Sequence, residues 1–290
     1  MKNFPKIAIK EDIKEEIELF INFLDHPDFP QHRNFILGAF PELKFLLSKS
    51  KKDEKIAVSN FVRNFHKEHK ANIRKIILED RSILKKKGRV VLQKLAEMMD
   101  YQWPKPITYI AMPTTLPFSP FGNNIFYFSI LRRIREKRDS RVLYIATHEI
   151  SHFIFFDLLK KIEKKNKFKL PKDALYYLKE ALTTALINQA PLRDLLGIKE
   201  DVGNQEIHDI YINKSGEKPK IIRDFIQEFY IQKTKKERKS FESFLDELIK
   251  IFILIAPAIS KKRLIWNRYG RTLIGKPRIL ARYRKPVPIK

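Results

Sequence analysis

The chain of 290 residues contains no cysteine. Disulfide bonds, thiolate metal ligands and cysteine nucleophiles are therefore excluded, so a bound metal would need histidine, carboxylate or water as ligands. Long apolar runs are also lacking. The most apolar stretch, residues 251–259, contains Pro257, and a membrane-spanning helix needs about 20 apolar residues. Residues 1–10 are not followed by the apolar core of a secretory signal. We expect a soluble, cytoplasmic protein with no membrane span.

Acidic residues are scarce relative to basic ones, 34 against 59, which gives a formal net charge of +25. Such a charge attracts nucleic acid, anionic membranes or acidic proteins, although lysines spread over solvated faces produce the same composition. Residues 261–290 carry 11 Lys or Arg and no Asp or Glu, with Trp266, Tyr269 and Tyr283 between the arginines. Base stacking and phosphate contacts use such residues. This basic tail therefore either binds an anionic partner such as nucleic acid or wraps on the protein surface.

Apolar spacing predicts an α+β fold that is predominantly helical. Residues 107–112 and 124–130 are rich in β-branched and aromatic side chains, which is typical of strands. Elsewhere apolar residues recur mostly three and four positions apart, which indicates helices. No Gly/Ser-rich linker divides the chain. We predict a helical N-terminal region at 1–100, a catalytic core with a small sheet at 101–216, and a helical C-terminal region with the basic tail at 217–290.

The most informative stretch is residues 140–157, which contains an H-E-x-x-H motif at positions 148–152. Residues four apart lie on one face of a helix, so His148 and His152 can offer two imidazoles to one metal ion. Glu149 lies beside them, where it can hold a metal-bound water. Asp139 or Ser140 can cap the start of this helix. The motif therefore predicts a zinc site.

Apolar residues surround the motif on nearly every side, and a helix that is apolar all round is buried. Buried polar, titratable side chains cost several kcal/mol unless something satisfies them, and a metal ion would do so. The alternative interpretation is a pair of core histidines hydrogen-bonded to carbonyl groups. Only the zinc interpretation requires a further residue, because catalytic zinc usually takes a third protein ligand in addition to water.

Glu180 is the first candidate for the third ligand. It lies on the next predicted helix, which opens at Pro171 and Asp173. The residues three and four positions from it on the helix are uncharged, and Lys179 is the only other charged residue between Tyr176 and Ala190. Its carboxylate therefore needs a partner, and a zinc ion on His148 and His152 would supply one. The remaining candidates for the third ligand are Asp157, Glu163, Asp173 and His208.

The H-E-I-S-H motif followed by a helical glutamate, after a strand-rich segment, resembles the gluzincin branch of the zinc metallopeptidases. The resemblance covers roughly residues 107–187. It implies a zincin-like catalytic core with zinc on His148, His152 and Glu180, and Glu149 as general base and acid. The expected function is therefore zinc-dependent hydrolysis of peptide bonds in a peptide or protein substrate.

Three other positions distinguish this chain from related zinc peptidases. The metzincin pattern is excluded, since it needs Gly and His where Phe155 and Leu158 stand. Many gluzincins place an acidic residue four positions after the ligand glutamate, to orient the first histidine, and that position is Thr184 here. Thr184 or its neighbour Thr183 can still hydrogen-bond a ligand.

Gluzincins commonly use a Tyr or His to hydrogen-bond the oxyanion that forms on the substrate. By analogy His208 or Tyr211 takes this role, and Tyr176 and Tyr177 compete for it. An exposed His on a surface turn is the alternative interpretation of this segment. The alternative function for the whole chain is a basic nucleic-acid-associated or scaffold protein in which zinc is structural or absent.

Overall fold

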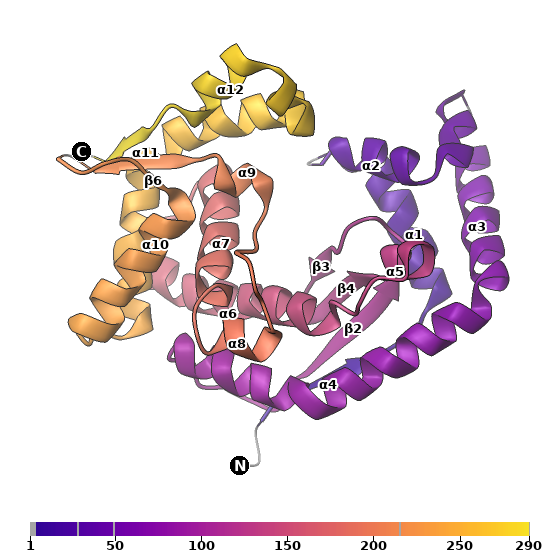
Figure 1. Cartoon of the computed structure of the whole chain (residues 1–290), viewed down its shortest axis with the longest axis horizontal. Coiled ribbons are helices and arrows are strands. Elements are labelled where there is room, and N and C mark those ends of the chain that lie inside the picture. The colour runs from indigo at the N-terminus through magenta and orange to yellow at the C-terminus, as the bar shows by residue number, and fades with distance from the viewer. Residues whose placement is uncertain (1–3, 28, 49, 215, 290) are drawn as a thin grey trace. The chain divides into compact units, whose positions relative to one another are not determined.

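The computed structural model describes residues 4–27, 29–48, 50–214 and 216–289 (Figure 1). Spatial contacts divide the chain into two compact units. Unit 1 comprises Met1–Leu92 and Trp103–Glu149, and unit 2 comprises Gln93–Gln102 and Ile150–Lys290. Helices dominate both units and each contains a small sheet, which confirms the predicted α+β, predominantly helical class. The division follows contacts in space, and the three regions expected from the sequence stay a prediction.

Unit 1 is built on a four-stranded sheet in the order β1-β2-β4-β3. Strand β2 (Thr108–Thr114) and strand β4 (Ile125–Ser129) confirm the two predicted strands and pair in parallel. Strand β1 (Lys6–Ile9) adds in parallel to β2, and the short β3 (Phe121–Gly122) pairs antiparallel with β4. The sequence did not predict β1, because its four residues are too few to show a pattern and their pairing partner lies about 100 residues away.

Helices cover the rest of unit 1, as the periodicity of residues 1–100 predicts. Helix α1 begins after Asp12, whose carboxylate accepts hydrogen bonds from the backbone N–H groups of Lys14 and Glu15. Ser50 caps α3 through the N–H of Asp53 in the same way. Such caps satisfy N–H groups that have no partner inside the helix. The helices that include unit 1 residues are α1 (Ile13–Leu24), α2 (Gln31–Ala39), η1 (Pro41–Ser48), α3 (Lys51–Glu68), α4 (Lys70–Met98), α5 (Leu131–Glu136) and the start of α6 (Val142–Asn166).

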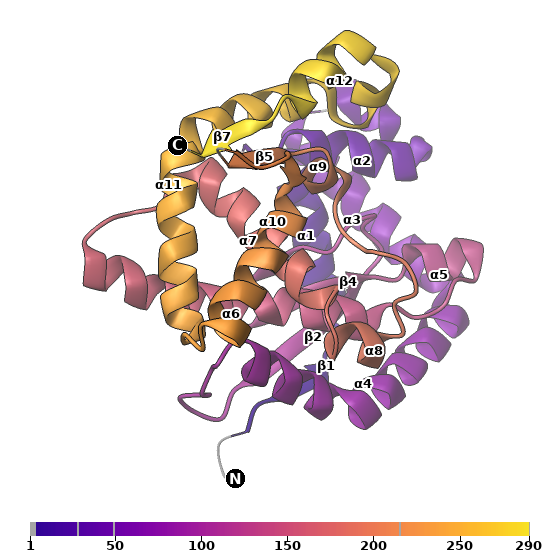
Figure 2. The ribbon, with the colours of Figure 1, turned by 60° about the vertical axis from the view of Figure 1, so that its left-hand side comes forward.

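Unit 2 is organised around α7 (Lys172–Ile187), which contacts both α10 (Ile222–Tyr230) and α11 (Phe241–Tyr269) (Figure 2). Most of the second half of α7 is buried, from Ala181 through Ile187. The smaller helices of the unit are α8 (Leu192–Leu196), α9 (Gln205–His208), η2 (Ile231–Lys236), η3 (Gly270–Gly275) and α12 (Pro277–Arg284). Its sheet has the order β6-β5-β7, with β5 (Tyr211–Lys214), β6 (Lys220–Ile221) and β7 (Val287–Ile289).

The basic tail is part of the folded unit 2. Strand β7 pairs in parallel with β5, which ties the end of the chain to residues 211–214. Tyr283 is fully buried. The Lys262 ammonium donates to the backbone carbonyl groups of Arg282, Tyr283 and Lys285, at the end of α12. These contacts show that the tail packs on the protein, which is one of the two expectations stated for it.

Helix α6 is long and apolar enough to cross a bilayer by length and composition alone, with a mean hydropathy of 1.3 over its most apolar window. Of that window, 61% is buried inside the protein. The core helix of a folded domain has the same properties, and α6 also carries the H-E-x-x-H motif. The sequence led us to expect no membrane span, and both that expectation and the cytoplasmic location stay predictions.

Candidate metal centre

The start of helix α6 is fixed by a serine cap. The Ser140 hydroxyl accepts a hydrogen bond from the N–H of Val142 at 3.2 Å, which confirms Ser140 as one of the two expected capping residues. The same hydroxyl donates to Asp80 at 2.5 Å, and Arg133 pairs with that carboxylate at 2.7 Å. Asp80 is buried, and burial raises its carboxyl pKa. These contacts hold the first turn of the helix two turns before the motif.

The motif is buried, as the apolar sequence around it predicts. The exposed fractions of Glu149 and His152 are 5% and 0%, and His148 is half-buried. Ile150 and Ile154, on the same helix, are fully buried. The division between the two units falls inside α6, directly after Glu149. Because the helix is continuous, its backbone still fixes His148 one turn before His152.

Helix α7 brings the third member of the site. It begins at Lys172, directly after Pro171, and it runs without Gly or Pro to Ile187. Glu180 lies in its middle, with 13% of its side chain exposed. Its carboxylate Oε1 lies 3.5 Å from Nε2 of His152. The two helices therefore approach each other as predicted, with an oxygen of Glu180 close to a nitrogen of His152.

His148, His152 and Glu180 form a cluster whose possible ligand atoms all lie within 4.8 Å of one another. Two ligands of a tetrahedral zinc at bond lengths of about 2.0–2.1 Å are roughly 3.3 Å apart. The 3.5 Å separation of His152 and Glu180 is close to that value. Two imidazoles and one carboxylate are also a ligand set that catalytic zinc uses. The residue types present therefore fit a zinc ion, which on binding would draw the three ligand atoms closer together than 4.8 Å.

Thr183 holds the second histidine in place. Its hydroxyl lies 3.2 Å from Nδ1 of His152 and 2.6 Å from the hydroxyl of Ser151, and all three side chains are buried. With Nδ1 engaged in this way, Nε2 of His152 faces Glu180. A hydrogen bond to one ring nitrogen fixes which nitrogen can bind a metal. Of the two threonines that the sequence offered for this role, Thr183 contacts a ligand, and the ligand is the second histidine.

We expect Thr183→Val to lower the affinity for zinc by about 10- to 100-fold, the usual effect of losing a partner of a metal-binding histidine. Valine has the shape of threonine and removes only the hydroxyl. Thr184→Val is the matched control, since it makes the same change at the adjacent buried position. Competition with a fluorescent zinc chelator measures both affinities. Equal affinities for the two variants would contradict the assignment.

Lys179 is a charged neighbour of the cluster. Its ammonium contacts the same carboxylate oxygen of Glu180 that faces His152, and it lies 5.2 Å from the centre of the Tyr176 ring. Side chains at successive helix positions point in different directions, so the lysine chain must fold back to make this contact. A metal bound by Glu180 would compete with Lys179 for that oxygen.

Tyr176 and Tyr177, one turn before Glu180 on helix α7, belong to a buried network around Glu206 of helix α9. Its carboxylate accepts hydrogen bonds from Tyr176 at 3.1 Å and Tyr177 at 2.5 Å, and it pairs with Arg263 at 2.7 Å. Burial raises the pKa of Glu206, and the charge of Arg263 acts in the opposite direction. Burial also raises the pKa values of both tyrosines well above the ordinary value. The two tyrosines that competed for the oxyanion role thus donate to Glu206.

The two expected oxyanion donors lie in unit 2. His208 ends helix α9, and its ring lies against Gly203 and the methyl group of Thr184: a Cβ built on Gly203 would be 2.8 Å from His208 Nε2 and 2.9 Å from Thr184 Cγ2. Thr184 follows Glu180 by one helical turn, so the imidazole lies beside this part of α7. Tyr211 is half-buried at the start of β5. Their role toward a substrate stays a prediction.

The other candidates for the third ligand are outside the cluster among the residues that the structure describes. The Asp157 carboxylate accepts from the Tyr101 hydroxyl and pairs with Lys161. Glu163 accepts from the backbone N–H of Leu170. Asp173 and His208 are likewise not members. Glu180 is therefore the carboxylate that the fold brings to the histidines.

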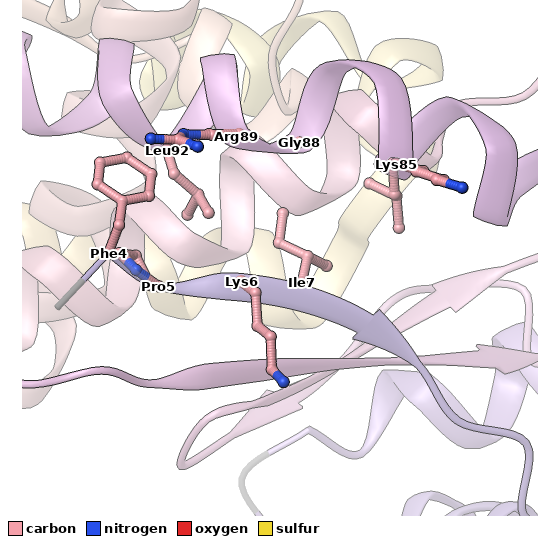
Figure 3. Close-up of a pocket in the computed structure, with 9 residues that line it drawn as sticks. Phe4, Pro5, Lys6, Ile7, Lys85, Gly88, Arg89 and Leu92 are labelled. Atoms are coloured by element: carbon pink, nitrogen blue, oxygen red, sulfur yellow. The ribbon is translucent and has the colours of Figure 1, made fainter. Parts of the chain in front are cut away.

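A cavity of about 400 Å³ lies elsewhere, between strand β1 and helix α4 in unit 1. Figure 3 shows Phe4 and Ile7 pointing from the strand side toward the helix, whereas Lys6 points away from it. The Arg89 guanidinium lies 5.4 Å from the centre of the Phe4 ring. Residues of the metal cluster do not line this cavity, so it adds nothing to that site.

Comparisons with protein-family models, with curated proteins and with solved structures find no match to this chain.

Proposed function

We propose that the protein is a zinc-dependent peptidase of the gluzincin type, with the zincin-like core that this implies. The observation that carries the proposal is the approach of Glu180 to His152 at 3.5 Å, within a cluster that also includes His148. His152 and Glu180 are 28 positions apart on two helices, so helix formation alone does not bring them together. An H-E-x-x-H match that arose by chance would have no reason to meet a helical glutamate.

His148, His152 and Glu180 would hold the ion, and Glu149 is left for proton transfer because it is not a member of the ligand cluster. When bound, zinc lowers the pKa of a coordinated water and polarises a carbonyl group. The Glu149 carboxylate accepts the proton of the attacking water and returns it to the leaving amine. Thr183 keeps the His152 ring in its orientation, and His208 or Tyr211 donates a hydrogen bond to the substrate oxyanion.

The alternative function, a nucleic-acid-associated or scaffold protein with structural or no zinc, depends on the basic tail. The folded tail uses Arg263 and Tyr283 inside unit 2, since Arg263 pairs with Glu206 and the Tyr283 hydroxyl donates to the Glu206 carbonyl at 2.9 Å. Fewer of its arginines and rings are then available to bases and phosphates. The peptidase proposal has more support.

The test of the proposal is cleavage of an unfolded protein substrate by the zinc-loaded chain, with Glu149→Gln as the variant that keeps the metal ligands. Cleavage by the wild type alone supports the peptidase. Equal cleavage by both proteins, or cleavage by neither, contradicts it.

A further inference from the structure

Helix α11 presents an exposed stripe after its last acidic residue, Glu247. Six exposed positions follow one another at intervals of four and three residues, which keeps them on one face of the helix. The buried side of the same helix includes Leu248, Phe252 and Ile259. We name the exposed face the α11 stripe, and it consists of Lys250, Leu254, Pro257, Lys261, Leu264 and Arg268.

The stripe combines aliphatic side chains with cations. Leu254 and Leu264 are 67% and 69% exposed, the highest values among the large hydrophobic residues that the structure describes. Ile274, in the following η3 segment, is 56% exposed. Large apolar side chains left in water mark surfaces that bind something when they gather with charged residues. Because the two leucines lie on one face of one helix, a single flat apolar surface can cover both.

The charged residues of the α11 stripe are all basic. No Asp or Glu follows Glu247 in the sequence. Lys250 pairs at 2.7 Å with Asp246, which lies one turn before it on the same helix. Beyond it, Lys261 and Arg268 flank Leu264 on the stripe, and both are exposed. A partner of this surface must be anionic as well as partly apolar.

A lipid surface fits these requirements better than nucleic acid does. Binding of single-stranded nucleic acid relies on aromatic rings on which bases stack. In this segment Tyr283 is fully buried, and the Trp266 ring lies against it with a centroid distance of 6.0 Å. The α11 stripe itself consists of lysine, arginine, leucine and proline, and it carries no aromatic ring. Basic helices with aliphatic side chains bind the interface of membranes that contain anionic lipid.

We propose that the α11 stripe docks the protein on the surface of a bilayer that contains anionic phospholipid. Leu254 and Leu264 enter the boundary between headgroups and acyl chains, and Lys261 and Arg268 face the anionic headgroups. The helix lies on the membrane and does not cross it. This docking is independent of the metal centre, so the His152→Ala variant binds vesicles as the wild type does.

The experiment measures sedimentation of the full chain with vesicles of phosphatidylcholine, and with vesicles of phosphatidylcholine and phosphatidylglycerol in equal amounts. We expect binding to the anionic vesicles only. Leu254→Ser/Leu264→Ser should lower the partition coefficient by about 10-fold or more, because two apolar anchors are lost. Lys261→Glu/Arg268→Glu should also lower the partition coefficient relative to the wild type, most strongly at low salt, because surface cations attract anionic lipid.

The matched control is Ile56→Ser/Leu78→Ser, which replaces two hydrophobic residues of similar exposure, 52% and 54%, on α3 and α4. This control should bind vesicles as the wild type does. Circular dichroism and urea midpoints must agree among all variants, so that loss of binding is not loss of folding. Equal binding by the stripe variant and the control overturns the proposal. Binding of a single-stranded RNA, lost in the stripe variants, without binding to vesicles would overturn it in favour of nucleic acid.

Discussion

The Glu149→Gln variant is expected to lose peptidase activity by about 100- to 10,000-fold, the usual contribution of a positioned general base. Glutamine has nearly the same shape as glutamate but cannot accept the proton of the attacking water at neutral pH. Glu149 is buried and lies between the two histidines in sequence, outside the ligand cluster. The variant should therefore keep its fold and its zinc while the rate falls. Hydrolysis rates per bound zinc measure the effect.

Glu163→Gln is the matched control for this variant. Glu163 lies on the same helix and accepts a hydrogen bond from the Leu170 N–H, which the amide oxygen of glutamine can also accept. We expect wild-type activity from it. If Glu149→Gln cleaved as fast as this control, proton transfer by Glu149 would be excluded.

The largest effect on stability is expected from Arg263→Met. Arg263 and Glu206 form an ion pair at 2.7 Å, with side-chain exposures of 8% and 2%. Removing one partner leaves the other buried without its counter-charge, which costs about 3–5 kcal/mol. We expect the free energy of unfolding in urea to fall by that amount. Arg268→Met, an exposed position on the same helix, should change it by less than about 0.5 kcal/mol.

The double variant Glu206→Gln/Arg263→Met separates the ion pair from the loss of packing. With neither charge present, the cost of an isolated buried carboxylate disappears, so part of the lost stability should return. A double variant that is no more stable than Arg263→Met alone would show that burial of the Glu206 charge is not the cause.

Local patterns predicted most of the elements that build the candidate site. The H-E-x-x-H helix is apolar on nearly every side, the helix of Glu180 opens at Pro171 and Asp173, and strands β2 and β4 are rich in β-branched and aromatic residues. Such a pattern depends on neighbouring residues only, so it can be recognised in the sequence. The proposed meeting of Glu180 with the histidines rested on an uncharged helical neighbourhood, and the structure brings the three residues together.

Long-range polar pairs could not be predicted in the same way. Glu16 is buried, accepts hydrogen bonds from Thr115 and pairs with His66 at 2.7 Å, although the residues around it in sequence do not distinguish it from a solvated glutamate. Arg263 gave no sign that it would pair with Glu206. In each case the partner lies 50 or more residues away, and a charged residue looks the same in sequence whether it faces water or a buried counter-charge.

The packing of the basic tail could not be predicted from local sequence patterns either. Its composition, rich in lysine and arginine, is typical of a solvated segment, and the aromatic residues allowed either stacking on bases or packing on the protein. Tyr283 is fully buried and Arg284 pairs with Asp209 at 2.7 Å. The packing of the tail depends on contacts with α9 and β5, which no local pattern describes, and an anionic partner stays a prediction.

The central claim is that one metal ion binds to His148, His152 and Glu180. Metal analysis of the purified protein, wild type beside His152→Ala and Glu180→Ala, tests it most directly. We predict about one zinc per chain in the wild type and loss of zinc in both variants, while the circular dichroism spectra stay the same. A wild type that folds and binds no zinc after loading, or variants that keep a full equivalent, would contradict the account.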